Sequence, residues 1–283
     1  MTRTPDGLPR LSDVIRTHSL TAHKGLGQNF ILDLNLTRRI ARAAGPLEEI
    51  TVVEIGAGPG GLTRALLLEG AAKVIAVERD ERCFPALEEI AAHYPGRVEI
   101  VRGDALEMEL GAHAPSPARI VANLPYGAST ELLAHWLCTE PWPPWYDRMV
   151  LMFQREVAER IVSSPGTKAY GRLSVLAQWR TSPRMVLTLP PQAFTPAPKV
   201  ESALVEFVPV LDPEPAGSCT ALQQVTAAAF TQRRKMLRNS LKSLMQEPEI
   251  TLKSLGLNPS LRGEVLSIGE FCALARCWHA ESS

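Results

Sequence analysis

The sequence predicts an α/β fold in which a mostly parallel sheet is followed by a small helical domain, and three observations lead to this prediction. Short apolar runs that suit buried strands alternate with helical patterns from Thr51 to about Val210. A glycine-rich turn follows the first of these runs, as in nucleotide-binding α/β proteins. Only helical patterns follow the linker at residues 212–218, which is rich in Pro and Gly. We therefore expect one domain over residues 1–210 and a second over residues 211–283.

The composition is that of a soluble globular protein. The 283 residues are 45% hydrophobic and 21% charged, which are ordinary values for a globular chain. No apolar stretch reaches the length of a membrane span, and the N-terminus lacks the hydrophobic core of a signal peptide. These observations predict a cytoplasmic protein without membrane association. The formal net charge of zero argues against a uniformly basic nucleic-acid binder.

The five cysteines, at positions 83, 138, 219, 272 and 277, form no metal-ligand pattern. An odd and scattered set also does not suggest a disulfide framework. We expect Cys83 and Cys138 to be small buried residues, and we expect no metal site.

The first strand–helix unit carries the glycine-rich turn, after a helical lead-in over residues 1–50. Val52–Ile55 predicts a buried strand, residues 56–61 read Gly-Ala-Gly-Pro-Gly-Gly, and Leu62–Leu68 predicts a helix. Without side chains, such a turn lets a ligand approach the backbone at the helix N-terminus. Glycines 56, 58 and 61 fit the dinucleotide fingerprint, whereas glycines 56, 58 and 60 fit the turn of S-adenosylmethionine enzymes. The turn alone leaves both cofactors open.

Three polar side chains follow successive predicted strands. Glu78 follows the run Lys73–Val77, about 20 residues past the first glycine, where an acid can hold ribose hydroxyls. Asp104 follows Val98–Val101 and can accept a hydrogen bond from the amino group of an adenine. Each acid taken alone is more often a solvated carboxylate or a helix cap. A nicotinamide enzyme has no need for Asn123, which follows the next strand, so the series favours S-adenosylmethionine.

The tetrapeptide Asn123-Leu124-Pro125-Tyr126 suits an exocyclic amino group on a flat ring. The Asn123 side-chain oxygen and the Leu124 carbonyl, held extended by the following proline, can accept the two N–H donors of the amine. Tyr126 can stack on the ring. An ordinary strand-to-loop turn is the alternative for an isolated tetrapeptide. The polar series upstream favours methylation of an amine instead.

The end of the first domain predicts a strand at Arg148–Phe153, a helix at Arg155–Val162 and a further element at Leu173–Trp179. The runs Arg184–Leu187 and Ala203–Val208 flank a proline-rich loop, and they predict a terminal hairpin with an antiparallel strand. Beyond the linker, we expect helices near residues 219–231, 232–246, 250–256 and 268–279.

A basic run lies in the second of these C-terminal helices. It contains no acidic residue and consists of Arg233, Arg234, Lys235, Arg238 and Lys242. On a helix, Leu237, Leu241 and Leu244 would face the core, and most of these cations would lie along an adjoining arc. Such an arc can bind RNA phosphates, and a solvated helix face is the alternative.

These features together resemble the ribosomal RNA adenine N6,N6-dimethyltransferase family, which includes the bacterial enzymes that modify 16S rRNA of the small subunit. The resemblance runs from about Leu20 to near the C-terminus. It rests on six ordered blocks, at residues 27–30, 53–56, 123–126, 168–174, 194–200 and 232–235. One departure is Ala57, where many relatives carry proline; a small residue still allows close approach to the backbone.

The resemblance implies a Rossmann-like, class I S-adenosylmethionine-dependent methyltransferase fold. It implies that S-adenosylmethionine donates methyl groups to two adjacent adenosines near the 3′ end of 16S rRNA, in ribosome biogenesis, without a metal or an obligate protein partner. The cofactor-binding residues would be Asn29, Ile31, Gly56, Gly58, Glu78, Asp104 and Asn123, with Gln28 and Phe30 shaping the wall. The catalytic residues would be Asn123, Leu124, Pro125, Tyr126 and Phe194. The RNA-binding residues would be Arg233, Arg234, Lys235, Arg238 and Lys242.

Phe194 has two interpretations. Taken alone, its position among the prolines of residues 190–198 favours an apolar anchor for the loop. The resemblance instead implies that Phe194 packs against the target adenine, opposite Tyr126.

Three alternative functions stay open. Relatives that methylate a large-subunit rRNA adenosine share the glycine turn, although the blocks at residues 168–174 and 232–235 favour the small-subunit enzymes. A non-catalytic RNA-binding assembly factor could keep the same fold, and weak cofactor binding would favour it. A dehydrogenase is the most distant alternative, and nicotinamide binding would identify it.

Overall fold

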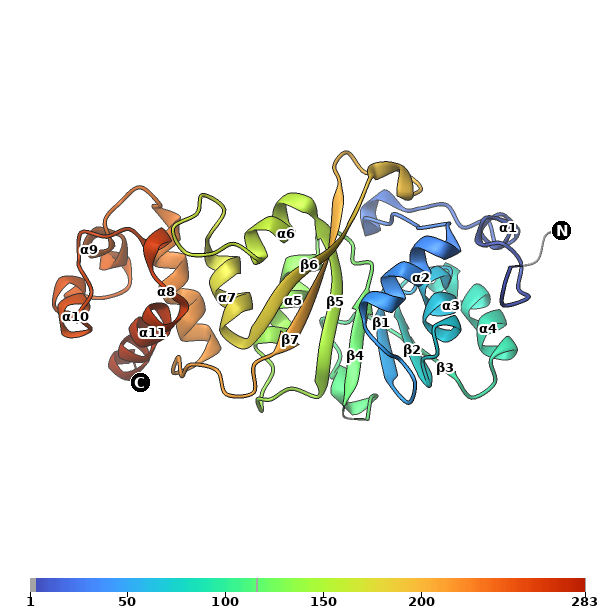
Figure 1. The fold of residues 1–283 in the computed structure, drawn as a ribbon, viewed down its shortest axis with the longest axis horizontal. Helices are drawn as coiled ribbons and strands as arrows, with labels where there is room; N and C mark the ends of the chain where they lie inside the picture. Colours follow the sequence, from blue (N-terminus) through green and yellow to red (C-terminus); the bar gives the residue numbers. More distant parts are fainter. Residues whose placement is uncertain (1–3, 116, 283) are drawn as a thin grey trace. The chain divides into compact units, whose positions relative to one another are not determined.

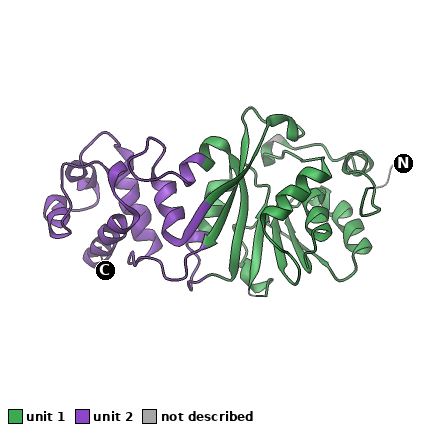
Figure 2. Ribbon diagram, viewed as in Figure 1, with its two compact units in different colours: residues 1–135, 144–158, 184–208 green, residues 136–143, 159–183, 209–283 purple. Residues whose placement is uncertain are grey.

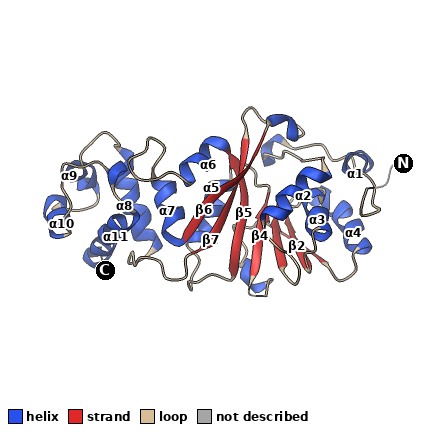
Figure 3. Cartoon of the chain, viewed as in Figure 1, coloured by secondary structure: helices blue, strands red, loops and turns tan. Residues whose placement is uncertain are grey.

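The computed structural model describes residues 4–115 and 117–282. Its centre is a seven-stranded sheet with the strand order β3-β2-β1-β4-β5-β7-β6 (Figures 1 and 3). The strands are β1 Thr51–Ile55, β2 Lys73–Glu78, β3 Val98–Arg102, β4 Ala118–Ala122, β5 Tyr146–Gln154, β6 Thr181–Leu189 and β7 Ser202–Pro209. Strands β1 to β5 pair in parallel, and β7 pairs antiparallel with β5. The predicted class I methyltransferase fold, with its terminal hairpin of β6 and β7, is confirmed.

Helices precede, connect and follow these strands. They are α1 Leu11–Thr17, α2 Leu34–Ala43, α3 Gly61–Leu68, α4 Phe84–His93, α5 Ser129–Leu137, α6 Arg155–Ile161, α7 Arg172–Arg180, α8 Cys219–Thr231, α9 Leu237–Ser240, α10 Pro248–Ser254 and α11 Ile268–Ser282. All five residues of β1 are buried, as expected for a central strand covered on both faces. Within the described residues, no helix is both long and apolar enough to cross a membrane.

The chain divides into two compact units (Figure 2). Unit 1 contains residues 1–135, 144–158 and 184–208, and unit 2 contains residues 136–143, 159–183 and 209–283. This division differs from the continuous domains predicted on either side of residue 210. The difference arises because α7 packs against α8 and α11, so that a segment from the middle of the chain joins the C-terminal helices.

Arg180, at the end of α7, holds several segments of unit 2 together. Its guanidinium group donates hydrogen bonds to the carbonyls of Leu137 and Thr139. The guanidinium carbon also lies 4.6 Å from the centre of the Trp142 ring and 4.2 Å from that of the Trp179 ring. Burial of this cation is therefore compensated by hydrogen bonds and two cation–π contacts.

The predicted continuous helix at residues 232–246 is wrong. Residues 232–236 form a turn and irregular backbone, α9 spans only Leu237–Ser240, and a short 3-10 helix follows at Leu241–Ser243. The helix is interrupted because the N–H groups of Leu237 and Arg238 donate to the carbonyls of Leu261 and Pro259, rather than to carbonyls four residues earlier.

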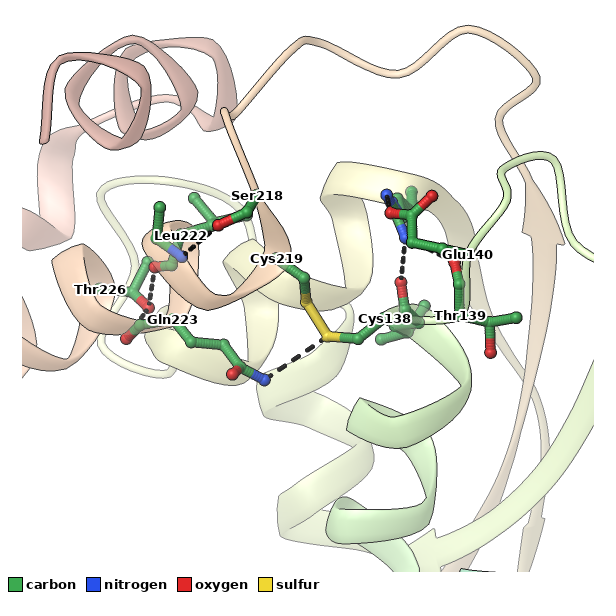
Figure 4. The surroundings of a disulfide bond; sticks show 11 residues. Cys138, Thr139, Glu140, Ser218, Cys219, Leu222, Gln223 and Thr226 are labelled. Atoms are coloured by element: carbon green, nitrogen blue, oxygen red, sulfur yellow. Dashed lines mark hydrogen bonds and ion pairs between the residues drawn. A yellow bond between two sulfur atoms is a disulfide. The ribbon is translucent and has the colours of Figure 1, made fainter. Parts of the chain in front are cut away.

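The cysteine pattern does not suggest a disulfide framework, and the expectation that Cys138 is a small buried residue is wrong, because Cys138 is partly exposed and disulfide-bonded. Cys138 and Cys219 are joined in unit 2, with their Cα atoms 5.6 Å apart (Figure 4). The two residues are 81 positions apart in the sequence, so only the tertiary packing of α8 brings them together. Cys83 is 1% exposed, as predicted, and burial raises the pKa of its thiol to about 12.

Candidate active site

The candidate active site is a pocket in unit 1 at the carboxyl ends of β1, β2, β3 and β4. It surrounds about 1140 Å³ of space that is partly open to solvent. Ten of the predicted site residues line this pocket: Asn29, Ile31, Gly56, Gly58, Glu78, Asp104, Asn123, Leu124, Pro125 and Tyr126. Such a location, at the ends of parallel strands, is where α/β proteins bind their ligands.

The glycine-rich turn between β1 and α3 forms the floor of the pocket. Gly56, Gly58 and Gly60 have φ values of 70°, 54° and 83°, which a side chain disfavours. A Cβ atom on Gly56 would meet nothing within 4 Å, so the absent side chain leaves open space at the pocket. A Cβ atom on Gly58 would lie 3.4 Å from the Phe30 ring. The turn therefore exposes its backbone to a ligand and packs closely beneath Phe30.

Glu78, at the end of β2, is fixed by backbone donors. Its carboxylate accepts hydrogen bonds from the N–H groups of Gly58 at 2.6 Å, Arg79 at 2.8 Å and Asp80 at 2.8 Å. The side chain is 6% exposed, and burial raises its pKa although these N–H groups oppose the change. The carboxylate therefore ties the glycine turn to β2 and stays in the pocket wall.

Asp104 lies beyond β3, at another part of the wall. Its Oδ1 accepts from the Leu106 N–H at 3.1 Å, and its Oδ2 accepts from Arg79 Nη1 at 2.9 Å. The Leu106 N–H and the Arg79 cation lower the pKa of Asp104. Each oxygen retains a second lone pair, so this carboxylate can still accept from an amino group.

The side chain of Asn123 has a defined orientation. Its Nδ2 donates to the carbonyl of Asn29 at 3.0 Å, so its Oδ1 remains as the acceptor of the amide. The chain then turns sharply into α5, because the Ala128 N–H donates to the Pro125 carbonyl at 3.0 Å. The Ser129 hydroxyl donates to the Tyr126 carbonyl, also at 3.0 Å. This turn fixes the backbone of Tyr126 beside Asn123.

The segment of residues 27–30 lies across the pocket and is held at both ends. Gln28 Nε2 donates to Asp80 Oδ2 at 2.7 Å. Phe30 and Thr195 exchange backbone hydrogen bonds of 2.9 and 2.8 Å. A Cβ atom on Gly27 would lie 3.3 Å from the Pro125 side chain. These contacts hold the Asn29 carbonyl in the position from which it orients Asn123.

Phe194 is placed differently from the other predicted residues. It is 3% exposed, belongs to the hydrophobic core cluster of unit 1, and is absent from the described pocket lining. This burial favours its interpretation as an anchor for the proline-rich loop.

Several contacts near the pocket join residues that no sequence pattern connects. Arg64 of α3 is 2% exposed and donates to both Asp6 oxygens at 2.7 Å, which attaches the N-terminal segment to the helix after the glycine turn. A Cβ atom on Gly61 would lie 2.7 Å from Leu11, which also lines the pocket. Ser202 bonds the Tyr126 hydroxyl. These pairs are too distant in sequence for spacing to predict them.

The predicted RNA-binding residues lie in unit 2. Arg233 pairs with Glu264 at 2.9 Å and donates to the Thr167 carbonyl at 3.2 Å. Arg234, Lys235 and Lys242 are exposed. Arg238 is half-buried, and its Nη1 donates to the Ser260 hydroxyl at 3.3 Å. Over residues 4–115 and 117–282, no group of three or more His, Cys, Asp or Glu side chains could hold a metal ion.

The family model described as "Ribosomal RNA adenine dimethylase" matches residues 19–279. A protein of Rhodopseudomonas palustris (strain BisB5) named "Ribosomal RNA small subunit methyltransferase A" is 60% identical, with 95% of this chain and 94% of that protein aligned. A protein of the same name from Cereibacter sphaeroides (strain ATCC 17025 / ATH 2.4.3) is 57% identical, over 96% and 97% of the two chains.

Solved structures share the fold. A dimethyladenosine transferase from Plasmodium falciparum superposes with a TM-score of 0.72 at 24% identity, covering 86% of this chain and 94% of that one. The 23S rRNA methyltransferase ErmE gives a TM-score of 0.65 at 25% identity, covering 87% of this chain and 98% of that one.

Proposed function

This chain belongs to the ribosomal RNA adenine dimethylase family, and from that premise we propose that it methylates the N6 amino groups of two adjacent adenosines near the 3′ end of 16S rRNA. The product would be N6,N6-dimethyladenosine in the small ribosomal subunit, formed during ribosome biogenesis in the cytoplasm. The observation that carries this proposal is the orientation of Asn123. Its Oδ1 remains as an acceptor in a pocket that also contains Glu78 and Asp104.

The pocket fits S-adenosylmethionine, which supplies an electrophilic methyl group when it is bound. Gly56 leaves space for close approach to the backbone. Glu78 would accept from ribose hydroxyls, and Asp104 from the adenine amino group of the cofactor. Asn29 and Ile31 would cover the bound molecule from the opposite wall.

The target adenine would be activated by two acceptors of this chain. Asn123 Oδ1 and the Leu124 carbonyl would accept the two N–H groups, which favours a pyramidal nitrogen and stabilises the positive charge that develops there. Neither acceptor needs to act as a strong base, because the proton can leave after transfer. Orientation of the amine would supply much of the acceleration.

The base would have to leave its stack to reach this pocket. Tyr126 would then stack on the extruded ring, since it lines the pocket beside Asn123 and Pro125. Phe194 would affect the base only indirectly. Its buried side chain would anchor the loop in which Thr195 is hydrogen-bonded to the backbone of Phe30.

Residues 211–283 would bind RNA through their basic run. Arg234, Lys235, Arg238 and Lys242 can contact rRNA phosphates, and each phosphate contact strengthens binding without reading sequence. Arg233 would contribute less direct contact, because Glu264 already pairs with it.

The proposal is tested by transfer of labelled methyl groups to small subunits that lack adenosine methylation, followed by nuclease digestion and nucleoside identification. We expect N6,N6-dimethyladenosine at two adjacent positions near the 3′ end of 16S rRNA. Asn123→Ala should lower kcat by a factor on the order of 100 or more, since it removes a group that stabilises developing charge, and S-adenosylmethionine binding should largely remain. Asn35→Ala, an exposed asparagine of α2, serves as the matched control and should retain full activity.

Two results would contradict the proposal. Label in large subunits alone would assign the chain to large-subunit methylation. Tight binding of small subunits without any transfer would favour an assembly factor.

A further inference from the structure

Tyr126 is hydrogen-bonded both through its phenol hydroxyl and through its backbone carbonyl. Its hydroxyl is hydrogen-bonded to the hydroxyl of Ser202 at 2.5 Å. Ser202 is fully buried, with an exposed fraction of 0%, and it lies 76 residues further along the chain. Burial raises the pKa of Tyr126, so its phenol keeps its proton at neutral pH.

The Ser202 hydroxyl has a fixed position because two sets of contacts, a ladder pair and an adjacent Arg–Glu interaction, hold the start of β7. Ser202 pairs with Gln154 in the antiparallel ladder between β7 and β5. Immediately before it, the Glu201 carbonyl accepts from the Arg155 N–H at 2.9 Å, and the Glu201 carboxylate accepts from Arg155 Nη1 at 2.6 Å. The hydroxyl is therefore presented by a rigid strand rather than by a mobile loop.

The plane of the Tyr126 ring is consequently determined at both ends. The turn into α5 fixes its Cα atom, through the hydrogen bond from Ser129 to the Tyr126 carbonyl. A tyrosine side chain has two rotatable bonds that orient its ring, and a fixed hydroxyl removes most of that freedom. Since Tyr126 lines the pocket, this restraint acts on a surface that a planar ligand would contact.

We infer that Ser202 is a positioning residue, which holds the ring of Tyr126 in the plane that receives the extruded adenine. The inference rests on the function proposed above. Ser202 would not touch the base; it would act through the Tyr126 hydroxyl and so keep the amine aligned with Asn123. Misalignment of a base that still binds would lower kcat more than it weakens binding of small subunits, because rRNA phosphates dominate that binding.

A double-mutant cycle tests this coupling. Ser202→Ala and Tyr126→Phe each remove one partner of the same hydrogen bond and leave the aromatic ring in place. We expect each change to lower kcat by a similar factor, roughly 2- to 12-fold for the loss of one neutral hydrogen bond. The double variant should lose no more than either single variant. The Kd of S-adenosylmethionine, measured by calorimetry, should be unchanged in all three.

Two further variants distinguish positioning from a general loss of packing. Ser202→Thr keeps the hydroxyl and should retain most of the activity. Thr226→Val removes a buried hydroxyl of unit 2 without a large change in volume, and it should leave kcat unchanged.

If the losses of kcat in the two single variants multiply in the double variant, the inference is overturned. It is also overturned if the kcat of Ser202→Thr is as low as that of Ser202→Ala. A fall in cofactor affinity equal to the fall in kcat would also overturn it. If the wild-type protein transfers no methyl group to small subunits, the proposed function itself fails. If the wild type is active but the cycle shows no coupling, only the role of Ser202 fails.

Discussion

Glu54 lies in β1, directly before the glycine turn, and only 1% of its surface is exposed. Thr63 of α3 donates its hydroxyl hydrogen to Glu54 Oε2 at 2.5 Å. Burial raises the pKa of Glu54 to about 8, and the nearby carboxylate of Glu78 acts in the same direction. At neutral pH this group is therefore protonated in the folded protein, so the first strand carries no buried charge beneath the pocket.

The raised pKa predicts a specific dependence of stability on pH. Between about pH 4.5 and pH 8, the unfolded chain has lost the Glu54 proton while the folded protein retains it. Stability therefore falls as pH rises through this window, by up to about 1.4 kcal/mol per pH unit. Glu54→Gln should remove this contribution. The unfolding free energy of the variant relative to that of the wild type should therefore rise from pH 4.5 to pH 8 and then level off.

The measurement is urea unfolding of both proteins at a series of pH values, because other titrating groups cancel in the difference. A difference in unfolding free energy that stays constant over this range would show that Glu54 is ionised in the folded state.

The sequence could predict most individual residues of the pocket. Glu78 ends a strand, Asp104 and Asn123 follow strands, and parallel strands end at a common edge, so their meeting follows from the fold. Phe194 was harder to predict, because the same aromatic residue suits a loop anchor and a base-contacting wall. Phe194 is buried in the same core cluster as Leu189 and Leu204, and sequence spacing does not encode that tertiary packing.

At the level of elements, Gly60 determines how α3 begins. It is the N-cap of α3 and adopts the left-handed conformation, with φ of 83°. A Cβ atom at this position would lie 2.1 Å from Ile90 Cδ1 and 3.3 Å from Leu87 Cδ2, both in α4. The glycine therefore allows both the turn and close packing of α4 against it.

Gly60→Ala should destabilise the protein by about 1–3 kcal/mol, through backbone strain and overpacking together. Cofactor affinity should fall as well, since the same turn forms the floor of the pocket. Gly269→Ala is the matched control: Gly269 lies in α11 and a Cβ atom there meets nothing within 4 Å, so this change should be neutral or slightly stabilising. Equal effects of the two substitutions on thermal unfolding would show that Gly60 has no special role.

The RNA-binding role of the basic run stays a prediction, whereas its expected placement on one continuous helix is wrong. Leu237 and Leu241 are fully buried, as the helical pattern requires. The interruption at residues 232–236 depends on carbonyls supplied by residues 259–261, and no local sequence signal reports such a distant partner. The cations are therefore distributed over turns and a short helix instead of a single helical arc.

Removal of two members of this run, the exposed Arg234 and the half-buried Arg238, should weaken RNA binding without changing methyl-transfer chemistry. For Arg234→Ala with Arg238→Ala, we expect the slope of log K against log salt concentration to become shallower by roughly 1.5, on the basis of two lost phosphate contacts. Filter binding of small subunits across a salt series measures this slope. Lys253→Ala is a suitable control because Lys253 already pairs with Glu249 at 2.9 Å. An unchanged slope in the double variant would remove these two arginines from the RNA interface.

At the scale of the whole molecule, the two units are assembled from interleaved segments. Residues 136–143 and 159–183 belong to unit 2 although unit 1 resumes between and after them. Composition marks the linker at residues 212–218, but it gives no sign that earlier segments pack with the C-terminal helices. Side-chain contacts between segments decide that arrangement: Arg180 lies over the ring of Trp142, and Trp179 Nε1 donates to the Glu214 carbonyl at 2.7 Å.

The disulfide between Cys138 and Cys219 closes a loop across these segments. Cys219 is the first residue of α8, and Gln223 of the same helix donates from Nε2 to the Cys138 sulfur at 3.6 Å (Figure 4). A crosslink over 81 residues restricts the unfolded chain, and loops of this length give stabilisation of about 2–4 kcal/mol. We therefore expect Cys138→Ala to lower the unfolding free energy of the oxidised protein by this amount.

Alkylation followed by mass spectrometry checks the bridge directly. In denatured but unreduced protein, only Cys83, Cys272 and Cys277 should be modified, and reduction should expose the other two. A reductant should also bring the stability of the wild type down to that of Cys138→Ala, whereas Cys277→Ala should respond to reduction as the wild type does. Modification of all five cysteines without reduction would contradict the bridge, and α8 would then be held to residues 136–143 by packing alone.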